Sequence, residues 1–423
     1  MLQLSFIRNN RELVLRGLKK KNFTELDLVD QVINLDDNRK QLQQQSDALL
    51  AQRNAASKAI GELLAKGNKA EADAKKTEVG ALKEAIDGFA EQLAACETAL
   101  HEILVRLPNL QNERVPAGHA AEDNEVVRQT EHLPLLHASA VPHWDLIAKY
   151  DLVDFPTGVK ITGSGFPLYK GRGAKLQRSL IQYFLDFNTA AGYTEYLPPF
   201  MVNEASAYGT GQLPDKEGQM YFMPADNFYL IPTAEVPVTN IYRDEIVSAA
   251  SLPIKMTAYS PCFRREAGSF GKDVRGLNRV HQFDKVEIVQ LTMADNSYPA
   301  HQQMVEHVER LVQSLGLPYR ILCLCGGDMS FASALTYDFE VYSAAQQRWL
   351  EVSSVSNFES FQTNRMKIRT KDEQGKTQLL HSLNGSALAL PRIMASILEN
   401  NQTPEGIKIP EVLRPYFGSD SIS

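Results

Sequence analysis

Arginines beside carboxylates and small residues mark two stretches of the chain that could bind a substrate. The first begins with Phe-Arg-Arg-Glu at residues 263–266, continues through a Gly-rich basic loop, and ends with Arg-Val-His-Gln-Phe-Asp-Lys-Val-Glu at 279–287. The second is Asn-Gly-Ser-Ala-Leu-Ala-Leu-Pro-Arg at 384–392. The planar guanidinium group suits bidentate capture of carboxylate or phosphate. The two stretches together predict a site that holds a nucleoside triphosphate and a small zwitterion.

The common nucleotide-binding motifs are absent. The chain has no G-x-x-x-x-G-K-[ST]; the nearest text, residues 268–273, has the wrong spacing and lacks the hydroxyl after the lysine. No G-x-G-x-x-G follows a strand and opens a helix. A nucleotide site in this chain is therefore expected to be neither a P-loop nor a Rossmann site.

Arg264 stands at the exit of an apolar run, before a loop that adds Lys272, Arg275 and Arg279. An arginine at such a position can hold an α-phosphate oxygen against developing negative charge. The alternative is a surface hairpin with solvated charges, and the loop by itself does not decide between them.

Phe283 and Glu287 lie four residues apart, so a strand places both on one face. Phe283 is a candidate platform for a purine, and Glu287 beside an arginine can hold an α-amino group. The alternatives are a core aromatic residue and an ordinary ion pair on a strand.

A third stretch, residues 351–354, carries oxygen ligands of the kind that Mg²⁺ prefers. Strand alternation places Glu351 and Ser353 on one face, with Ser354 opposite unless the strand bends. His281 and His381 could act as bases, but a lone histidine is more often structural, and a carboxylate nucleophile needs no strong base.

The composition describes a protein of two domains in a reducing compartment. The chain has 423 residues, a net charge of −7 and four cysteines in no regular framework. We expect a cytoplasmic location, no signal peptide and no membrane span. The net charge gives no whole-chain basic footprint, although a local basic face can still bind nucleic acid. The Cys-Leu-Cys at 323–325 is a weak metal motif without a second pair.

Residues 31–107 predict a long antiparallel helical hairpin. In the first half, Leu or Ala recurs every seven residues at 35, 42, 49, 56 and 63, and the second half continues with spacings of three and four. The Lys-Gly-Asn at 66–68 is typical of a tight reversal. At about 1.5 Å per residue each arm would extend roughly 45–50 Å. One narrow seam is too small for a catalytic core, which indicates an arm that binds a partner.

Beyond a linker at 115–119, the pattern predicts an α+β domain on a mostly antiparallel sheet. The segments with strand character are residues 194–197, 228–231, 256–262, 282–291, 319–325, 334–341 and 349–356.

The ordered set of motifs strongly resembles the bacterial type of seryl-tRNA synthetase over essentially the whole chain. The motifs that carry the resemblance are residues 233–235, 263–269, 275–277, 281–287, 327–329, 351–354 with 356–357, and 384–392. The resemblance implies a class II catalytic domain over 111–423 and a tRNA-binding domain with a coiled-coil arm over 1–110. It implies a homodimer joined by a helix at about 173–190 and the strand that ends at Pro198 and Pro199.

The same resemblance assigns the site residues. Arg264, Arg392 and Glu351 would be catalytic, with Arg264 on the α-phosphate and Arg392 on the γ-phosphate. Serine would be bound by Thr233, Ala234, Glu235, Glu287 and Ser386. ATP would be bound by Arg264, Arg265, Glu266, Val280, Phe283, Glu351, Val352, Ser353, Ser354 and Arg392. Glu351 and Ser354 would hold Mg²⁺.

The resemblance implies formation of seryl-adenylate from L-serine and ATP, followed by transfer to the 3′-terminal adenosine of tRNA(Ser); tRNA(Sec) stays open. Gly326, Phe358, Phe270 and Asn278 depart from the family's usual residues, and we expect Gly326 and Phe358 beside the pocket. The alternatives are a non-charging paralogue, a coiled-coil interaction protein, and a ligase for another small amino acid. The metal ligands of the archaeal variant have no counterpart in the sequence.

Overall fold

The fold comes from a computed structural model, which describes residues 1–215, 217–267 and 275–423. Two compact units can be distinguished: Leu2–Lys19 with Phe23–Pro108, and Asn109–Ser423 with Met1 and Lys20–Asn22. In the described ranges, no helix has both the length and the apolar character that a bilayer span needs.

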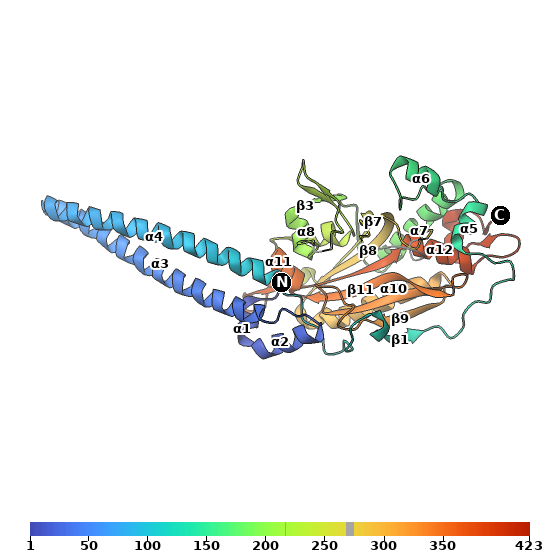
Figure 1. The fold of residues 1–423 in the computed structure, drawn as a ribbon, viewed down its shortest axis with the longest axis horizontal. Helices are drawn as coiled ribbons and strands as arrows, with labels where there is room; N and C mark the ends of the chain where they lie inside the picture. The colour runs from blue at the N-terminus through green and yellow to red at the C-terminus, as the bar shows by residue number, and fades with distance from the viewer. Residues whose placement is uncertain (216, 268–274) are drawn as a thin grey trace. The chain divides into compact units, whose positions relative to one another are not determined.

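The first unit is dominated by two long helices that run side by side, α3 (Leu28–Ala65) and α4 (Lys69–Leu104) (Figure 1). They follow two short helices, α1 (Leu4–Asn9) and α2 (Arg11–Lys20). The predicted seam is confirmed: Leu42 and Ala56 of α3 and Ile86 and Cys96 of α4 are buried. The reversal falls where the sequence predicted it, at Gly67, whose φ of 81° is costly for a residue with a Cβ.

The second unit is built on an eight-stranded sheet, antiparallel except for its last pair, which confirms the predicted fold class. In spatial order the strands are β1 (Glu125–Gln129), β9 (Tyr319–Cys323), β10 (Leu335–Ser343), β11 (Arg348–Glu359), β14 (His381–Ala389), β8 (Gln282–Thr292), β7 (Ile254–Phe263) and β2 (Thr194–Tyr196).

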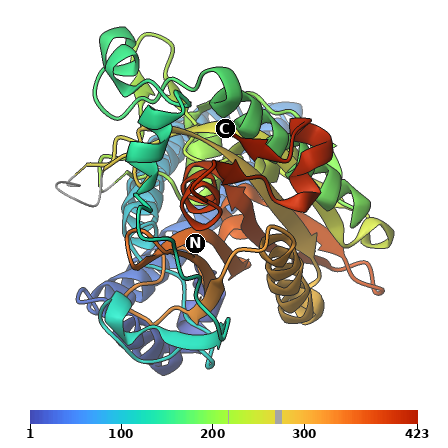
Figure 2. The same cartoon turned by 90° about the vertical axis from the view of Figure 1, so that its right-hand side faces the viewer.

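Three helices cover one face of this sheet: α7 (Gly171–Ala190), α10 (Ser297–Ser314) and α12 (Leu390–Asn400). Figure 2 shows α10 in brown and α12 in red beside the strands. One apolar core joins them to the sheet and includes Leu180, Val308 and Ile393 from the helices with Ile288 and Phe339 from the strands. Since strand residues alternate between faces, Phe283, Lys285 and Glu287 of β8 belong to the opposite face.

Smaller elements surround the sheet. The remaining helices are α5 (His143–Lys149), α6 (Phe155–Ile161), α8 (Glu204–Thr210), α9 (Glu235–Thr239), α11 (Phe361–Met366) and α13 (Arg414–Phe417). The small sheets consist of β3 (Met201–Asn203), β5 (Phe228–Leu230) and β4 (Phe222–Met223); β13 (Thr377–Leu379), β12 (Arg369–Lys371) and β6 (Ile246–Val247); and β15 (Ile407–Lys408) with β16 (Ser421–Ile422).

A bulge in β11 changes the face of a predicted site residue. Glu351 pairs with Glu340 and Ser354 pairs with Asp338, with a register shift between the two pairs. Glu340 and Asp338 are two residues apart on β10, so their partners share one face. The expectation that Glu351 and Ser353 share a face is therefore wrong, because the extra residue moves Ser354 to the side of Glu351.

Candidate active site

The centre of the sheet gathers buried charged groups. Glu287 on β8 pairs across the ladder with Ser386 on β14, so these two predicted serine-binding residues are direct neighbours. The Lys285 Nζ lies 2.6 Å from a carboxylate oxygen of Glu287, and both side chains are less than 10 % exposed. Desolvation offsets much of the attraction in an ion pair buried this deeply, so the pair is weak evidence for a contribution to stability.

Glu235 begins α9 and is fixed by its neighbours. Its backbone N–H donates to the Thr233 hydroxyl at 3.3 Å, and its carboxylate accepts a hydrogen bond of 2.6 Å from the Gln362 amide. Burial, followed by the charge of Glu287, raises the pKa of Glu235 to about 7, while Gln362, Lys285 and Arg264 act in the opposite direction. The structure therefore places Glu235 in contact with Thr233 and within the electrostatic influence of Glu287.

Gln362 was not predicted from the sequence. Its amide also donates to the Thr210 carbonyl at 3.0 Å, and its own carbonyl accepts from the Ser382 hydroxyl at 2.7 Å. These partners leave one orientation for the amide. No sequence signal identifies Gln362, because its contacts come from α8, α9 and β14.

Arg264 follows β7 and lies over the ring of Phe283, with its guanidinium carbon 5.2 Å from the ring centre. Its backbone N–H donates to His281 O at 2.9 Å and its Nε to Pro232 O at 3.4 Å. The predicted phosphate ligand and the predicted adenine platform are thus in contact. Arg265 lies over the Tyr221 ring instead.

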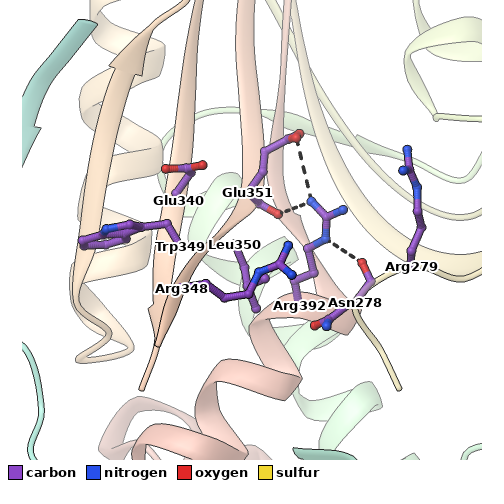
Figure 3. A pocket seen from close by; sticks show the side chains of 8 residues that line it. All are labelled: Asn278, Arg279, Glu340, Arg348, Trp349, Leu350, Glu351 and Arg392. Carbon is purple, nitrogen blue, oxygen red and sulfur yellow. Dashed lines mark hydrogen bonds and ion pairs between the residues drawn. The ribbon is translucent and has the colours of Figure 1, made fainter. Parts of the chain in front are cut away.

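A pocket of about 280 Å³ opens beside the first turn of α12 (Figure 3). Its lining residues are Asn278, Arg279, Glu340, Arg348, Trp349, Leu350, Glu351 and Arg392. Three arginines against two carboxylates give the lining an excess of positive charge, which favours an anionic ligand.

Arg392 is held in this pocket by backbone oxygen atoms. Its Nε donates to Asn278 O and its Nη1 to Glu351 O, each at 2.8 Å, and Nη1 lies 3.8 Å from the Glu351 carboxylate (Figure 3). Arg264 does not line the pocket. Glu266, two residues after Arg264, forms an ion pair with Arg279, which does line the pocket.

Sequence models of two domain families match the chain. Residues 222–401 match the tRNA synthetase class II core domain (G, H, P, S and T), and residues 1–111 match the seryl-tRNA synthetase N-terminal domain. A serine–tRNA ligase from Salinibacter ruber is 48% identical over 420 residues, covering 99% of this chain and 98% of the relative. One from Prosthecochloris aestuarii is 45% identical over 429 residues, covering 100% and 99%.

Solved structures show the same similarity as the sequence comparisons. A seryl-tRNA synthetase from Pyrococcus horikoshii, crystallised with ATP, superposes with a TM-score of 0.92 at 31% identity and covers 100% of this chain and 99% of its own. The chain belongs to the seryl-tRNA synthetase family. Its activity is accordingly that of an aminoacyl-tRNA ligase for serine.

In this member of the family, two of the predicted ATP residues have their side chains on the helix-covered face. Val352 belongs to the apolar core there, and the Ser353 hydroxyl donates to Ser386 O at 2.6 Å. Only the backbone of these two residues can therefore face a ligand on the site side. Val280 and Ala234 are buried apolar neighbours of the site residues.

The carboxylates near Ser354 do not form a ready-made metal centre. Within the described ranges, no group of three or more His, Cys, Asp or Glu side chains is arranged to hold a metal ion. Burial, followed by the charge of Glu351, raises the pKa of Asp338 well above its usual value. Glu351 and Ser354 thus lie on the same face of the sheet as a carboxyl that tends to stay protonated.

The two histidines considered as bases have structural partners. His281 Nδ1 lies 2.9 Å from the Tyr221 hydroxyl, and His381 Nδ1 lies 2.8 Å from the Ser297 hydroxyl. Burial lowers the pKa of His381 to about 4, so it is neutral at physiological pH.

The sequence predicts Gly326 and Phe358, two unusual residues for the family, beside the pocket. The nearest neighbours of Gly326 are Lys20 O and the side chain of Gln111, and no predicted site residue is among them. The Asn109 side-chain amide donates to the Phe358 carbonyl at 2.9 Å, so Phe358 contacts the segment that precedes the linker. Residues 268–274, which include Lys272 and Phe270, lie outside the described residues.

Proposed function

We propose that Arg264 and the neighbouring pocket that contains Arg392 together activate L-serine with ATP, and that the seryl group then passes to tRNA(Ser). One observation carries this assignment of roles: Glu287 pairs with Ser386 on adjacent strands, and the charges of both Glu287 and Arg264 act on Glu235. This arrangement offers an amino-acid site of acidic and hydroxyl groups next to a polyanion site.

Serine would bind through complementary charges. The carboxylates of Glu235 and Glu287 hold its ammonium group, and the hydroxyls of Thr233 and Ser386 are available to its side-chain hydroxyl. A site that pairs its buried polar groups with the substrate hydroxyl rejects alanine strongly, because those groups would lose a partner. Rejecting threonine depends on a lack of room.

ATP would bind with its adenine beside Phe283 and its α-phosphate on Arg264. Arg392, already oriented by two carbonyl groups, would hold the γ-phosphate without further reorganisation. Glu351 and Ser354 are suited to Mg²⁺, which takes one or two protein ligands together with phosphate oxygens and water. When bound, the ion would neutralise charge on the phosphates.

The chemistry then follows from position and charge. A serine carboxylate oxygen attacks the α-phosphorus of ATP and displaces pyrophosphate, while Arg264 stabilises the charge on the α-phosphate. A hydroxyl of the terminal adenosine of tRNA next attacks the carbonyl carbon of the adenylate and displaces AMP. No residue has to act as a strong base in the first step, because the nucleophile is ionised.

We also propose roles for the two domains and for a dimer interface. The helical arm within residues 1–110 would bind tRNA, and residues 111–423 would form the catalytic domain. The helix α7 with β2 would join two copies of the chain; Leu197 beside β2 is 77% exposed, as an interface residue would be in one isolated copy. Charging of tRNA(Sec) and a cytoplasmic location also belong to this proposal.

The decisive measurement is ATP–pyrophosphate exchange with a panel of serine, alanine, threonine and glycine. We expect exchange with serine alone. Arg264→Ala should lower the rate about 100- to 1,000-fold, the usual effect of losing one stabilising donor at a developing charge. Arg310→Ala, which removes an exposed arginine of α10, is the control and should leave it unchanged. Absence of serine-dependent exchange would refute the proposal.

A further inference from the structure

A buried histidine outside the pocket holds the segment that leads into β8. His143, the first residue of α5, is 0% exposed, and its Nε2 lies 2.9 Å from the backbone nitrogen of Leu277. Its Nδ1 lies 2.7 Å from the Glu399 carboxylate. Because a backbone N–H can only donate, Nε2 carries no proton, so the neutral ring must carry its proton on Nδ1 and donate it to Glu399.

Glu399 lies near the end of α12, the helix whose first turn carries Arg392. Its carboxylate accepts hydrogen bonds from the His143 ring, the His143 backbone N–H at 2.9 Å, the Gln346 amide at 2.9 Å and the Ser343 hydroxyl. Burial alone would raise the pKa of Glu399, but its interactions with His143, followed by the hydrogen bond from Ser343, bring it below its ordinary value. Glu399 is therefore a buried anion that organises four donors.

A second branch of the network reaches Arg392. The Asn278 amide donates to the Gln346 side-chain oxygen at 2.9 Å, and Asn278 O accepts from Arg392 Nε at 2.8 Å (Figure 3). Gln346 also donates to Glu399. The contacts thus connect the last turn of α12 to its first turn through the backbone of residues 277–278. Asn278, one of the departures from the usual family sequence, provides a link in this chain.

Helix α5 shapes the same segment in two more places. Gly276 has a φ of 64°, and a Cβ at that position would lie 2.4 Å from His143 Nε2. Arg275 lies over the Trp144 ring, with its guanidinium carbon 4.5 Å from the ring centre. Arg275, Leu277 and Asn278 therefore each contact α5 or the Glu399 network, and the close approach of His143 at Gly276 leaves no room for a side chain there.

We propose that His143 and Glu399 are positioning residues for ATP binding: they fix the backbone of Leu277 and Asn278, which aims Arg392 at the phosphates. Neither residue lines the pocket, so both act through the segment they hold. The inference rests on the proposed function, in which Arg392 binds ATP. Loss of the hydrogen bond to Leu277 would let Arg392 and its carbonyl partner sample other directions and weaken ATP binding.

Two substitutions of His143 test the roles of its two ring nitrogen atoms separately. In His143→Asn the amide can replace the Nδ1–H donor to Glu399 but provides nothing for the Leu277 N–H. In His143→Gln the longer side chain can present its oxygen near the Nε2 position and accept from Leu277. We expect His143→Asn to raise both the KM for ATP in exchange and the Kd for ATP by calorimetry about tenfold, the usual effect of an unsatisfied buried donor.

For His143→Asn, the same assays should give a KM for serine within about twofold of the wild-type value. In His143→Gln, the Kd for ATP should return to within about threefold of the wild-type value. His307→Asn is the matched control, since His307 is another buried histidine with a hydrogen bond, to Asn188 on α7. It should lower the unfolding temperature but not change the Kd for ATP.

The proposal is overturned if His143→Asn lowers kcat alone with the KM for ATP unchanged, or if His143→Gln binds ATP as weakly as His143→Asn. Should His143→Asn not fold, Gln346→Ala removes the second branch at a partly exposed turn. It should raise the KM for ATP about threefold, and an unchanged value would also overturn the proposal. If wild type itself lacks exchange, calorimetric ATP binding still tests the positioning, so the two failures can be distinguished.

Discussion

Glu235 illustrates how burial can adapt a single carboxyl to its ligand. Its pKa of about 7 means that neutral pH leaves it partly protonated, and the charge of Glu287 contributes to this. A serine ammonium group that binds between the two carboxylates would stabilise their ionised forms. Binding of serine should therefore lower the pKa of these carboxyl groups and favour the loss of the proton from Glu235.

We predict that kcat/KM for serine depends on pH. Since only ionised Glu235 can pair with an ammonium group, kcat/KM for serine should fall by up to about tenfold for each pH unit below about 7. Gln362→Leu removes a hydrogen bond that lowers this pKa, so the fall should begin at higher pH. Exchange rates at subsaturating serine across a pH series measure both curves; superimposable profiles would contradict the argument.

At the scale of one element, the bulge in β11 separates two adjacent serines. Ser353 lies on the core side and donates to Ser386 O, whereas Ser354 lies on the side of Glu351. We expect Ser353→Ala to lower the free energy of unfolding by about 1 kcal/mol while leaving the KM for ATP unchanged.

Ser354→Ala should do the reverse. It removes an oxygen proposed for Mg²⁺ and phosphate, so the KM for ATP should rise several-fold at limiting Mg²⁺ with little change in unfolding temperature. Denaturant titration and exchange kinetics on both variants provide the test. If Ser353→Ala altered ATP use more than Ser354→Ala did, the assignment of faces to function would be wrong.

At the scale of the whole molecule, activation and tRNA recognition are expected to reside in different parts of the chain. Cys96 accepts from Asn38 and donates to Leu35 O near the base of the hairpin, so residues 45–89 can be replaced by a short Gly-containing turn with these contacts retained. The shortened protein should keep serine-dependent exchange and lose at least tenfold in tRNA(Ser) charging at limiting tRNA, because folded RNA is read largely through its shape. A parallel loss of both activities would show that the arm supports the catalytic unit instead.

The elements with strong periodic patterns were predictable, and the central strand β14 was not. The seam of α3 and α4 repeats at fixed spacings, so its burial follows from helix geometry alone. In contrast, β14 begins His-Ser-Leu-Asn-Gly-Ser, and such small and polar residues have little intrinsic preference for strands. It is a strand because β8 and β11 pair with it on both sides.

The sequence by itself determined the identities and the order of the chemical groups: the two arginines, the acidic residues, the hydroxyls and the long helical arm, each readable from local spacing. Tertiary structure alone decided which of these groups meet. The bulge that turns Ser354 toward Glu351, the Gln362 amide that fixes Glu235 and the link from His143 through Leu277 toward Arg392 all join residues far apart in the chain. Such contacts depend on strand register and helix packing, which no local pattern of residues encodes.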